Sequence, residues 1–542
     1  MSTRPNKQKF TGRSGYTGFV FATNFLQLDH KHKHYSAISA TPFRNAWHSS
    51  LRSHDATAAD AQLEYTDLDT LANTLKESYI IGETDQVQDT ILSNSILQSL
   101  LSNEGFTSVE EVGCHLINAA IIATTEKDRL NRGSLSAMLN AVLASCCQKG
   151  DSGESTKYPD LALEILQQMD NMHSKDENTM VCPDLVSLSL VYYSLHQSGL
   201  HHQAQSNLLE RAQKLAKKSA GSQRRKELAA ERRKKPSYVS SVNLSADLQS
   251  IYGPEISVLH EDDDIVIISK PGGMVCYHNK RTSAGKLTMS RKKKSRAANN
   301  KDGGKSNDSE ATKMDISLVD ALLDVLPLST LNPSARGIVH RLDRGTSGTI
   351  VLAKNDEVHL RLVALFFLRR VKKKYFALVP GRSLDDNNDL APEGDINLPV
   401  DGRPAFSKYR VVGMYSDKTK QQPDPAVLLL EVETITGRKH QVRVHCATGL
   451  RRPIFLDPIY SYRINTVSPK DSKLKRNQKQ CGEDRNTEDT ISFFIRQVPR
   501  FKEQFFLHAS SITIPELEVE AKAPLPECWT DTLRQLDEMS CH

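Results

Sequence analysis

The sequence predicts an α+β fold, in which an all-α N-terminal region precedes a mixed-sheet domain. In the first half, apolar residues recur at the spacing of one buried helix face, as in Leu135, Met138 and Leu139. In the second half, short β-branched runs such as Ile265 to Ile268 end in turns, without a strict strand–helix alternation. A chain of 542 residues is also too long for one hydrophobic core, so at least two domains are expected.

The helical region is expected over residues 56–215 and admits two interpretations. The stretch PDLVSLSLVYYSLHQSGLHHQAQ resembles a pentatricopeptide repeat, with Pro183 before a first helix, Gly199 between two helices and Ala204 in the second. Repeats of that kind bind single-stranded RNA. A plain helical bundle accounts for the same apolar pattern, so both interpretations stay open.

The first 54 residues are basic and rich in hydroxyl groups, with eight Lys or Arg and a single acid, Asp29. Such a composition is typical of an organelle transit peptide. We therefore expect residues 1–55 to direct the chain to a mitochondrion or plastid. The alternative is a disordered basic tail on a nuclear or cytoplasmic protein.

Charge and cysteine usage narrow the class of partner. The net charge of +6 is mild but unevenly distributed, which favours local basic patches and nucleic acid as the partner. The nine cysteines show no C-x-x-C or paired Cys/His spacing, so neither a metal site nor a disulfide framework is expected. No apolar run approaches 18 residues, so no membrane span is expected.

Composition also sets the remaining boundaries. The charge-dense residues 216–248 are expected to form a basic linker before the mixed α+β domain, residues 249–525. Within that domain, the polar residues 279–314 and 463–490 are expected to be disordered insertions. Residues 526–542 are expected to form a C-terminal tail.

Asp343 lies in the stretch GIVHRLDRGTSGTIVLAKND, on a loop predicted between two apolar strands. Two potential cations, His340 and Arg341, precede it. A nearby positive charge favours the ionised carboxylate, which suits a nucleophile, a general base or a structural ion pair. A protein-kinase catalytic loop is excluded, because Leu342 interrupts the H-R-D order and Gly348 stands where such a loop has Asn.

The segment TGRKHQVRVHCA is predicted to form a strand that carries cations. In strand geometry, Gln441, Arg443 and His445 face one side, and Val442 and Val444 face the other. The valine side would pack on the core, and the opposite side would present positive charge.

Four motifs follow one another in the second half: K-P-G-G, H-R-L-D-x-x-T-S-G, K-x-Y and G-R-x-H-Q-x-R-x-H. This order resembles the RluA-type family of pseudouridine synthases, over roughly residues 250–515. The resemblance implies that Asp343 is the essential catalytic residue, that Tyr375 packs on the target base, and that Arg443 pairs with the catalytic aspartate. It also implies RNA contacts by further residues of these motifs: His340, Arg341, Thr346, Lys373, Arg438, His440 and Gln441.

The resemblance implies an isomerase that converts uridine to pseudouridine in rRNA or tRNA, without a cofactor or a metal, and we expect it to act as a monomer. The alternative is a non-catalytic RNA-binding or ribosome-assembly factor on the same fold. The chain departs from the family's P-I-L-G-D segment, because Leu456 replaces the glycine before Asp457. We expect this change to alter a local turn and to leave the chemistry intact.

Overall fold

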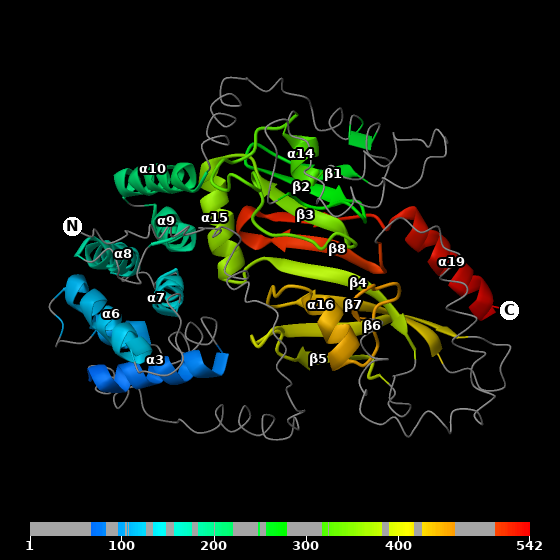
Figure 1. The fold of residues 1–542 in the computed structure, drawn as a ribbon, viewed down its shortest axis with the longest axis horizontal. Coiled ribbons are helices and arrows are strands. Elements are labelled where there is room, and N and C mark those ends of the chain that lie inside the picture. The colour runs from blue at the N-terminus through cyan, green and yellow to red at the C-terminus, as the bar shows by residue number, and fades with distance from the viewer. Residues whose placement is uncertain are drawn as a thin grey trace, which may run out of the picture.

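The computed structural model consists of a stack of helices followed by one mixed sheet (Figure 1). The structure describes residues 67–82, 96–102, 106, 108–125, 134–147, 157–175, 183–199, 201–220, 246, 248–249, 256–278, 317–323, 325–381, 390–416, 425–460 and 504–541. The predicted segments 1–55, 279–314 and 463–490 therefore lie outside the described residues, as does most of 216–248. The domain boundaries stay predictions.

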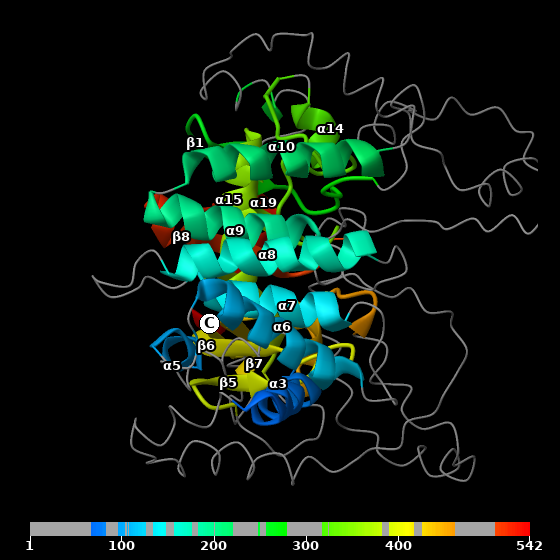
Figure 2. The same ribbon diagram turned by 90° about the vertical axis from the view of Figure 1, so that its left-hand side faces the viewer.

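The N-terminal half is helical, as predicted. Its helices are α3 (Leu68–Gly82), α5 (Ile96–Ser102), α6 (Val109–Thr125), α7 (Ser134–Ser145), α8 (Lys157–Lys175), α9 (Leu185–Ser198) and α10 (His202–Ser219). Figure 2 shows α10, α9 and α8 stacked side by side, with α9 in contact with both neighbours. Whether the helices form pentatricopeptide-type repeats stays a prediction.

Residues at both ends of helix α9 determine where the helix begins and ends. Its first turn is closed by a capping box, in which the Asp184 carboxylate accepts a hydrogen bond from the Ser187 amide and the Ser187 hydroxyl accepts one from the Asp184 amide. It ends at Gly199, which adopts the left-handed conformation that glycine accepts without strain. All residues from 185 to 195 are buried, so this helix is surrounded by other elements on every side.

The second half contains one mixed sheet. Its described strands are β1 (Ser257–Glu261), β2 (Ile265–Lys270), β3 (Ser347–Ala353), β4 (Lys372–Pro380), β5 (Glu393–Asn397), β6 (Phe406–Ser416), β7 (Pro425–Thr434), β8 (Leu507–Ile514) and β9 (Val519–Lys522). The order is β1-β2-β3-β8-β4-β7-β6-β5, and β9 pairs with β8. Only the β3–β8 pair of these is parallel. The predicted α+β class is confirmed.

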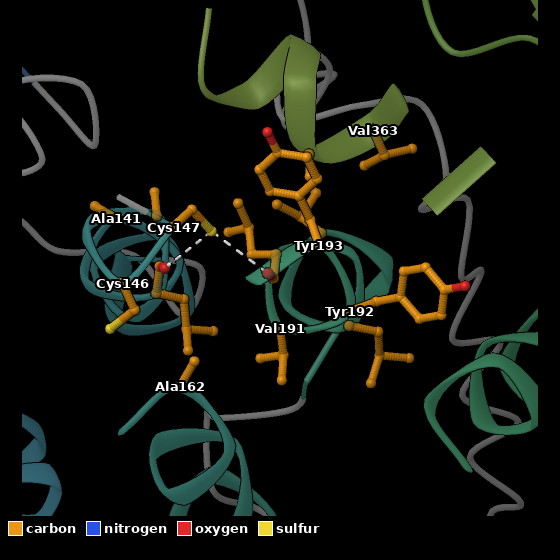
Figure 3. Close-up of a cluster of buried hydrophobic side chains, with 14 of the residues drawn as sticks. Ala141, Cys146, Cys147, Ala162, Val191, Tyr192, Tyr193 and Val363 are labelled. Atoms are coloured by element: carbon orange, nitrogen blue, oxygen red, sulfur yellow. Dashed lines mark hydrogen bonds between the residues drawn. The ribbon is translucent and has the colours of Figure 1, made fainter. Parts of the chain in front are cut away.

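Four described α-helices accompany the sheet: α14 (Leu318–Leu322), α15 (Asp356–Phe367), α16 (Gln441–Val444) and α19 (Glu527–Cys541). Helix α15 lies between α9 and β3 and contacts both (Figure 1). Val191, Val363 and Val351, one from each of these elements, belong to a single buried core. Figure 3 shows Tyr193 and Val363 in this cluster. The helical half and the sheet are thus joined by packed side chains as well as by the chain.

A polar contact reinforces this junction. Arg370, just after α15, donates hydrogen bonds to the Tyr193 hydroxyl at 2.7 Å and to the Cys147 carbonyl at 3.0 Å. Gln213 of α10 donates to the Asp356 carboxylate, which also accepts from Thr330 in the loop that leads toward Asp343. The helices therefore contact the same element that supports the acid loop.

Two sequence predictions are wrong at the level of elements. The segment expected as a strand forms α16 and a π-helical turn, His445–Gly449, because the side chain of Gln441 closes a tight turn directly after β7. The expected C-terminal tail, residues 526–542, is instead dominated by α19. Trp529 and Leu536 of this helix are buried against the sheet, at a spacing typical of one helix face.

A third difference concerns the loop before Asp343. The strand expected there is reduced to a single bridge between Ile338 and Leu352, so Asp343 follows a long irregular segment. The strand expected after the turn is confirmed as β3. Among the described residues, no helix combines the length and the hydropathy needed to cross a bilayer.

Candidate active site

Asp343 and Arg443 form a direct ion pair. The guanidinium Nη1 of Arg443 donates to Oδ2 of Asp343 at 2.9 Å. The Arg443 side chain is 4% exposed, whereas that of Asp343 is 17% exposed. The carboxylate is therefore held by a buried cation on one side and remains reachable from outside.

Arg443 itself is fixed by a second carboxylate, that of Asp457. Its Nε and Nη2 donate to the two Asp457 oxygens at 2.7 and 2.8 Å, a bidentate arrangement that sets the plane of the guanidinium. The rings of Tyr460 and Phe505 lie 5.1 and 4.5 Å from its central carbon. The sequence did not indicate a role for Asp457, although the altered P-I-L-G-D segment contains it.

The electrostatics of this cluster favour the charged form of Arg443. Burial alone would lower the pKa of Arg443, but the hydrogen bonds and charges of Asp457 and Asp343 outweigh it and raise the pKa above its ordinary value. The guanidinium is thus a permanent positive charge beside Asp343.

Tyr375, on β4, is the third predicted catalytic residue and neighbours Asp343. Burial and then the negative charge of Asp343 raise its pKa, against a smaller lowering by a hydrogen bond with Thr434. The phenol therefore stays protonated and presents an uncharged ring. The structure brings together all three residues that the sequence assigned to catalysis, Asp343, Tyr375 and Arg443.

The K-P-G-G motif supports the acid loop from the other side. Lys270 is fully buried, and its Nζ donates to the carbonyls of Pro271 and Met274 at 2.8 Å and of Arg344 at 3.4 Å. The Gly273 amide donates to the same Arg344 carbonyl at 2.8 Å. Two motifs distant in sequence are thus joined at the residue that follows Asp343.

His440 lies beside Asp343 rather than on the outer surface. Its Nε2 is 3.5 Å from Oδ1 of Asp343, and its Nδ1 is 3.0 Å from the Tyr460 hydroxyl. Its backbone is left-handed, with φ of 60°. The structure thus places His440 directly beside Asp343, and its predicted RNA contact stays a prediction.

His340 is held by contacts within the fold, and its predicted RNA contact stays a prediction. Its Nε2 accepts a hydrogen bond from the Val351 amide at 3.0 Å, and its ring stacks on Phe366 at 4.7 Å. Burial and then the charge of Lys373 lower the pKa of His340 to about 3. The ring is therefore neutral at pH 7 and serves to hold the acid loop against β3 and α15.

Thr346 and Gln441 are both buried, at 2% and 4% exposure. The Thr346 amide donates to the Asp343 carbonyl and closes the turn after the acid. The Gln441 oxygen accepts from the Thr436 hydroxyl and the Arg438 amide, and its nitrogen donates to the Phe406 carbonyl. These hydrogen bonds shape the turns beside Asp343 and Arg443, and the RNA contacts predicted for Thr346 and Gln441 stay predictions.

The other three predicted RNA contacts, Arg341, Arg438 and Lys373, have different surroundings. Arg341 is exposed and lines a cavity of about 320 Å³ together with Tyr277 and Arg344. Arg438 is half-buried, and its Nε donates to the Pro404 carbonyl. Lys373 lies over the ring of Phe366 at 5.6 Å, and burial followed by the charge of Arg369 lowers its pKa to about 8. Their RNA contacts stay predictions.

Leu456 adopts a left-handed backbone, with φ of 64°. This is the conformation that glycine would accept freely and that costs a leucine about 1–2 kcal/mol. The turn thus keeps a conformation that suits glycine, and the adjacent Asp457 still reaches Arg443. Among the described residues, no group of three or more His, Cys, Asp or Glu side chains is arranged to hold a metal ion.

Comparisons with known proteins identify one family. A family model described as RNA pseudouridylate synthase matches residues 264–448. A protein of Chloroflexus aurantiacus named as an uncharacterized RNA pseudouridine synthase is 41% identical over 154 residues, which cover 27% of this chain and 46% of that protein. One of Zymomonas mobilis with the same description is 35% identical over 206 residues, covering 36% and 75%.

A third relative is ribosomal large subunit pseudouridine synthase D of Xanthomonas campestris, 30% identical over 283 residues, covering 50% of this chain and 66% of that protein. The chain thus spans less than half of the Chloroflexus relative and three quarters of the Zymomonas relative. The order of the motifs, the arrangement around Asp343 and these matches lead to one conclusion: the chain belongs to the RluA-type family of RNA pseudouridine synthases.

Proposed function

We propose that this chain is an isomerase that converts uridine to pseudouridine in RNA, with Asp343 as the catalytic acid residue. The observation that carries the proposal is the Arg443–Asp343 pair at 2.9 Å, with the arginine buried and the carboxylate still accessible. An enzyme that works on a sugar carbon needs such an ionised, oriented carboxylate next to open space.

The proposed reaction breaks the N1–C1′ bond of uridine, turns the uracil and joins C5 to C1′. Product and substrate have the same composition, so the reaction needs no oxidant, reductant or water. Asp343 either attacks the sugar or removes one of its protons, and both roles need the carboxylate ionised. Arg443 supplies a positive charge in direct contact with this carboxylate.

Tyr375 is proposed to hold the base. A uridine within paired RNA must leave its stack, which costs a few kcal/mol. Stacking of a base on an aromatic ring contributes roughly 1–3 kcal/mol and so offsets part of that cost. The protonated, uncharged ring of Tyr375 beside Asp343 is suited to this contact.

We further propose rRNA or tRNA as the substrate and a monomer as the working form. The printed name of the Xanthomonas relative, a ribosomal large subunit enzyme, supports rRNA. The pentatricopeptide-like α9–α10 segment would then serve as an additional RNA contact. Delivery to a mitochondrion or plastid by residues 1–55 is part of the same proposal and rests on composition alone.

The test is to incubate the full chain with transcribed rRNA and with transcribed tRNA, without added metal, and to quantify pseudouridine after digestion to nucleosides. We expect pseudouridine to form in at least one pool. RNA binding without any pseudouridine in either pool would refute the proposal and favour the alternative, a non-catalytic RNA-binding or ribosome-assembly factor.

A further inference from the structure

We infer that His440 is a second catalytic residue, which removes the proton from C5 of the uracil after C5 has joined the sugar. The inference rests on the proposed function and extends it by a step that the proposed function leaves without a base. It is carried by the position of His440 within the ion-pair cluster.

The proposed reaction requires a base at this step. Carbon C5 carries a hydrogen in uridine, and once C5 is bonded to C1′ this hydrogen must leave as a proton. The electron pair of the C5–H bond then restores the C5=C6 double bond of the ring. N1, which has lost its bond to C1′, ends the reaction with a proton, so atoms and charge balance without a co-reactant.

The distance between His440 and Asp343 places the imidazole ring close to the proposed reaction at C5. Nε2 of His440 is 3.5 Å from Oδ1 of Asp343, and both side chains are about equally accessible, at 18% and 17% exposure. Asp343 acts on the sugar in the proposed reaction, and C5 is one bond from C1′ at this stage. A base that neighbours Asp343 on its open side is therefore within reach of C5.

The other polar groups of the cluster are unsuited to take up a proton. Tyr375 keeps its own, because burial and the charge of Asp343 raise its pKa. Arg443 is a permanent cation held by two carboxylates, and Asp457 is fully buried behind it. Among the described residues that surround Asp343, His440 is the group that can accept a proton and still contact a ligand.

The surroundings of His440 fit both of its charge states. Burial lowers its pKa, with Asp343 and Asp457 acting in the opposite direction and Arg443 and Lys439 acting in the same one, so the ring is neutral and able to act as a base at pH 7. Once it is protonated, the Asp343 carboxylate at 3.5 Å becomes its counter-ion.

The Tyr460 hydroxyl assists the neutral ring. In the tautomer with its proton on Nδ1, the ring donates to the Tyr460 hydroxyl, and the lone pair of Nε2 is free to take up a proton. The left-handed backbone of His440, φ of 60°, is a conformation that most residues avoid and that occurs often where a side chain is held for function. The Val444 amide donates to its carbonyl at 2.9 Å and secures it.

The experiment measures pseudouridine formation in single turnovers by the full chain, on rRNA and tRNA transcripts that carry hydrogen or deuterium at C5 of uridine. His440→Asn keeps a polar side chain that tolerates the left-handed backbone but cannot act as the base. We expect the rate to fall by roughly 100-fold or more. The deuterium isotope effect should exceed that of the wild type, because proton removal becomes the slow step.

His440→Gly provides a second readout, since it vacates the place of the ring without straining the backbone. Added imidazole should raise the rate of this variant and leave that of Asp343→Asn unchanged. A slow His440→Asn variant with a wild-type isotope effect, together with no rescue by imidazole, would reduce His440 to a structural role. If the wild type itself forms no pseudouridine, the proposed function fails instead.

Discussion

Among individual residues, Arg443 connects the most parts of the site. It joins the accessible Asp343 to the buried Asp457 and lies between the rings of Tyr460 and Phe505. A guanidinium held in this way loses little freedom when it orients Asp343. The pair thus behaves as one preformed unit whose accessible end is the carboxylate.

The buried contact of Arg443 predicts the effect of Asp457→Asn. Removal of one partner from a buried ion pair leaves an uncompensated charge and costs about 3–5 kcal/mol. We expect the free energy of unfolding in urea to fall by about 3 kcal/mol and pseudouridine formation to slow, because Arg443 loses its orientation. The exposed Asp395→Asn is the control and should shift stability by less than about 0.5 kcal/mol. Equal effects of the two substitutions would contradict this role.

His340 predicts a pH dependence. Its pKa in the folded state is lowered to about 3, whereas an unfolded histidine titrates near 6.5. The unfolded chain therefore binds a proton between these values that the folded chain does not, so the contribution to stability is full above pH 6.5 and is lost as the pH falls. His340→Gln can still accept from the Val351 amide. The slope of the free energy of unfolding against pH between pH 7 and 5 should then be smaller by an amount that corresponds to about one proton. An unchanged slope in urea titrations would contradict this assignment.

The sequence identified Asp343, Tyr375 and Arg443 because each lies in a motif whose order is distinctive. It did not reveal that His340 and Gln441 form hydrogen bonds within the fold, since a polar residue in such a motif fits a ligand contact and an internal hydrogen-bonding partner equally well. Only the positions of Val351, Phe366 and Phe406 in the folded chain reveal these internal contacts.

At the scale of elements, the active site depends on the approach of β3 to β8, the one parallel pair among the described strands. Gly348 adopts φ of 109° at this crossing, and a Cβ there would collide with the carbonyl of Ala509. The apolar pattern was sufficient to predict the strands β2 and β3. It failed at α16, because alternating Val and polar residues in so short a segment fit a strand, and the hydrogen bonds of Gln441 determine the helical turn.

Gly348→Ala tests the β3–β8 contact. The added methyl group must displace the Ala509 backbone, so we expect a loss of more than about 2 kcal/mol in the free energy of unfolding. Gly402→Ala is a matched control, since Gly402 also has a positive φ, of 77°, but no atom lies within 4 Å of the added carbon. It should lose only about 1–2 kcal/mol through backbone strain. Similar losses in both variants would show that β3 and β8 separate without cost.

For the whole molecule, the shared core of α9, α15 and β3 implies that the helical half and the sheet unfold together. Hydrogen exchange followed by mass spectrometry at increasing urea should show the amides of α9 and β3 losing protection over the same range. Exchange of α9 while β3 remains protected would contradict this. The sequence predicted both halves but not that they pack against each other. The apolar face of α15 does not reveal which element covers it.

The account as a whole depends most on Asp343, and the most direct measurement is tritium release from RNA labelled at C5 of uridine. Asp343→Asn keeps the shape of the side chain and its contact with Arg443 but removes the negative charge. We expect release by the wild type and none above background by the variant, with equal RNA binding by both. Release by Asp343→Asn at the wild-type rate would contradict the central role of this carboxylate.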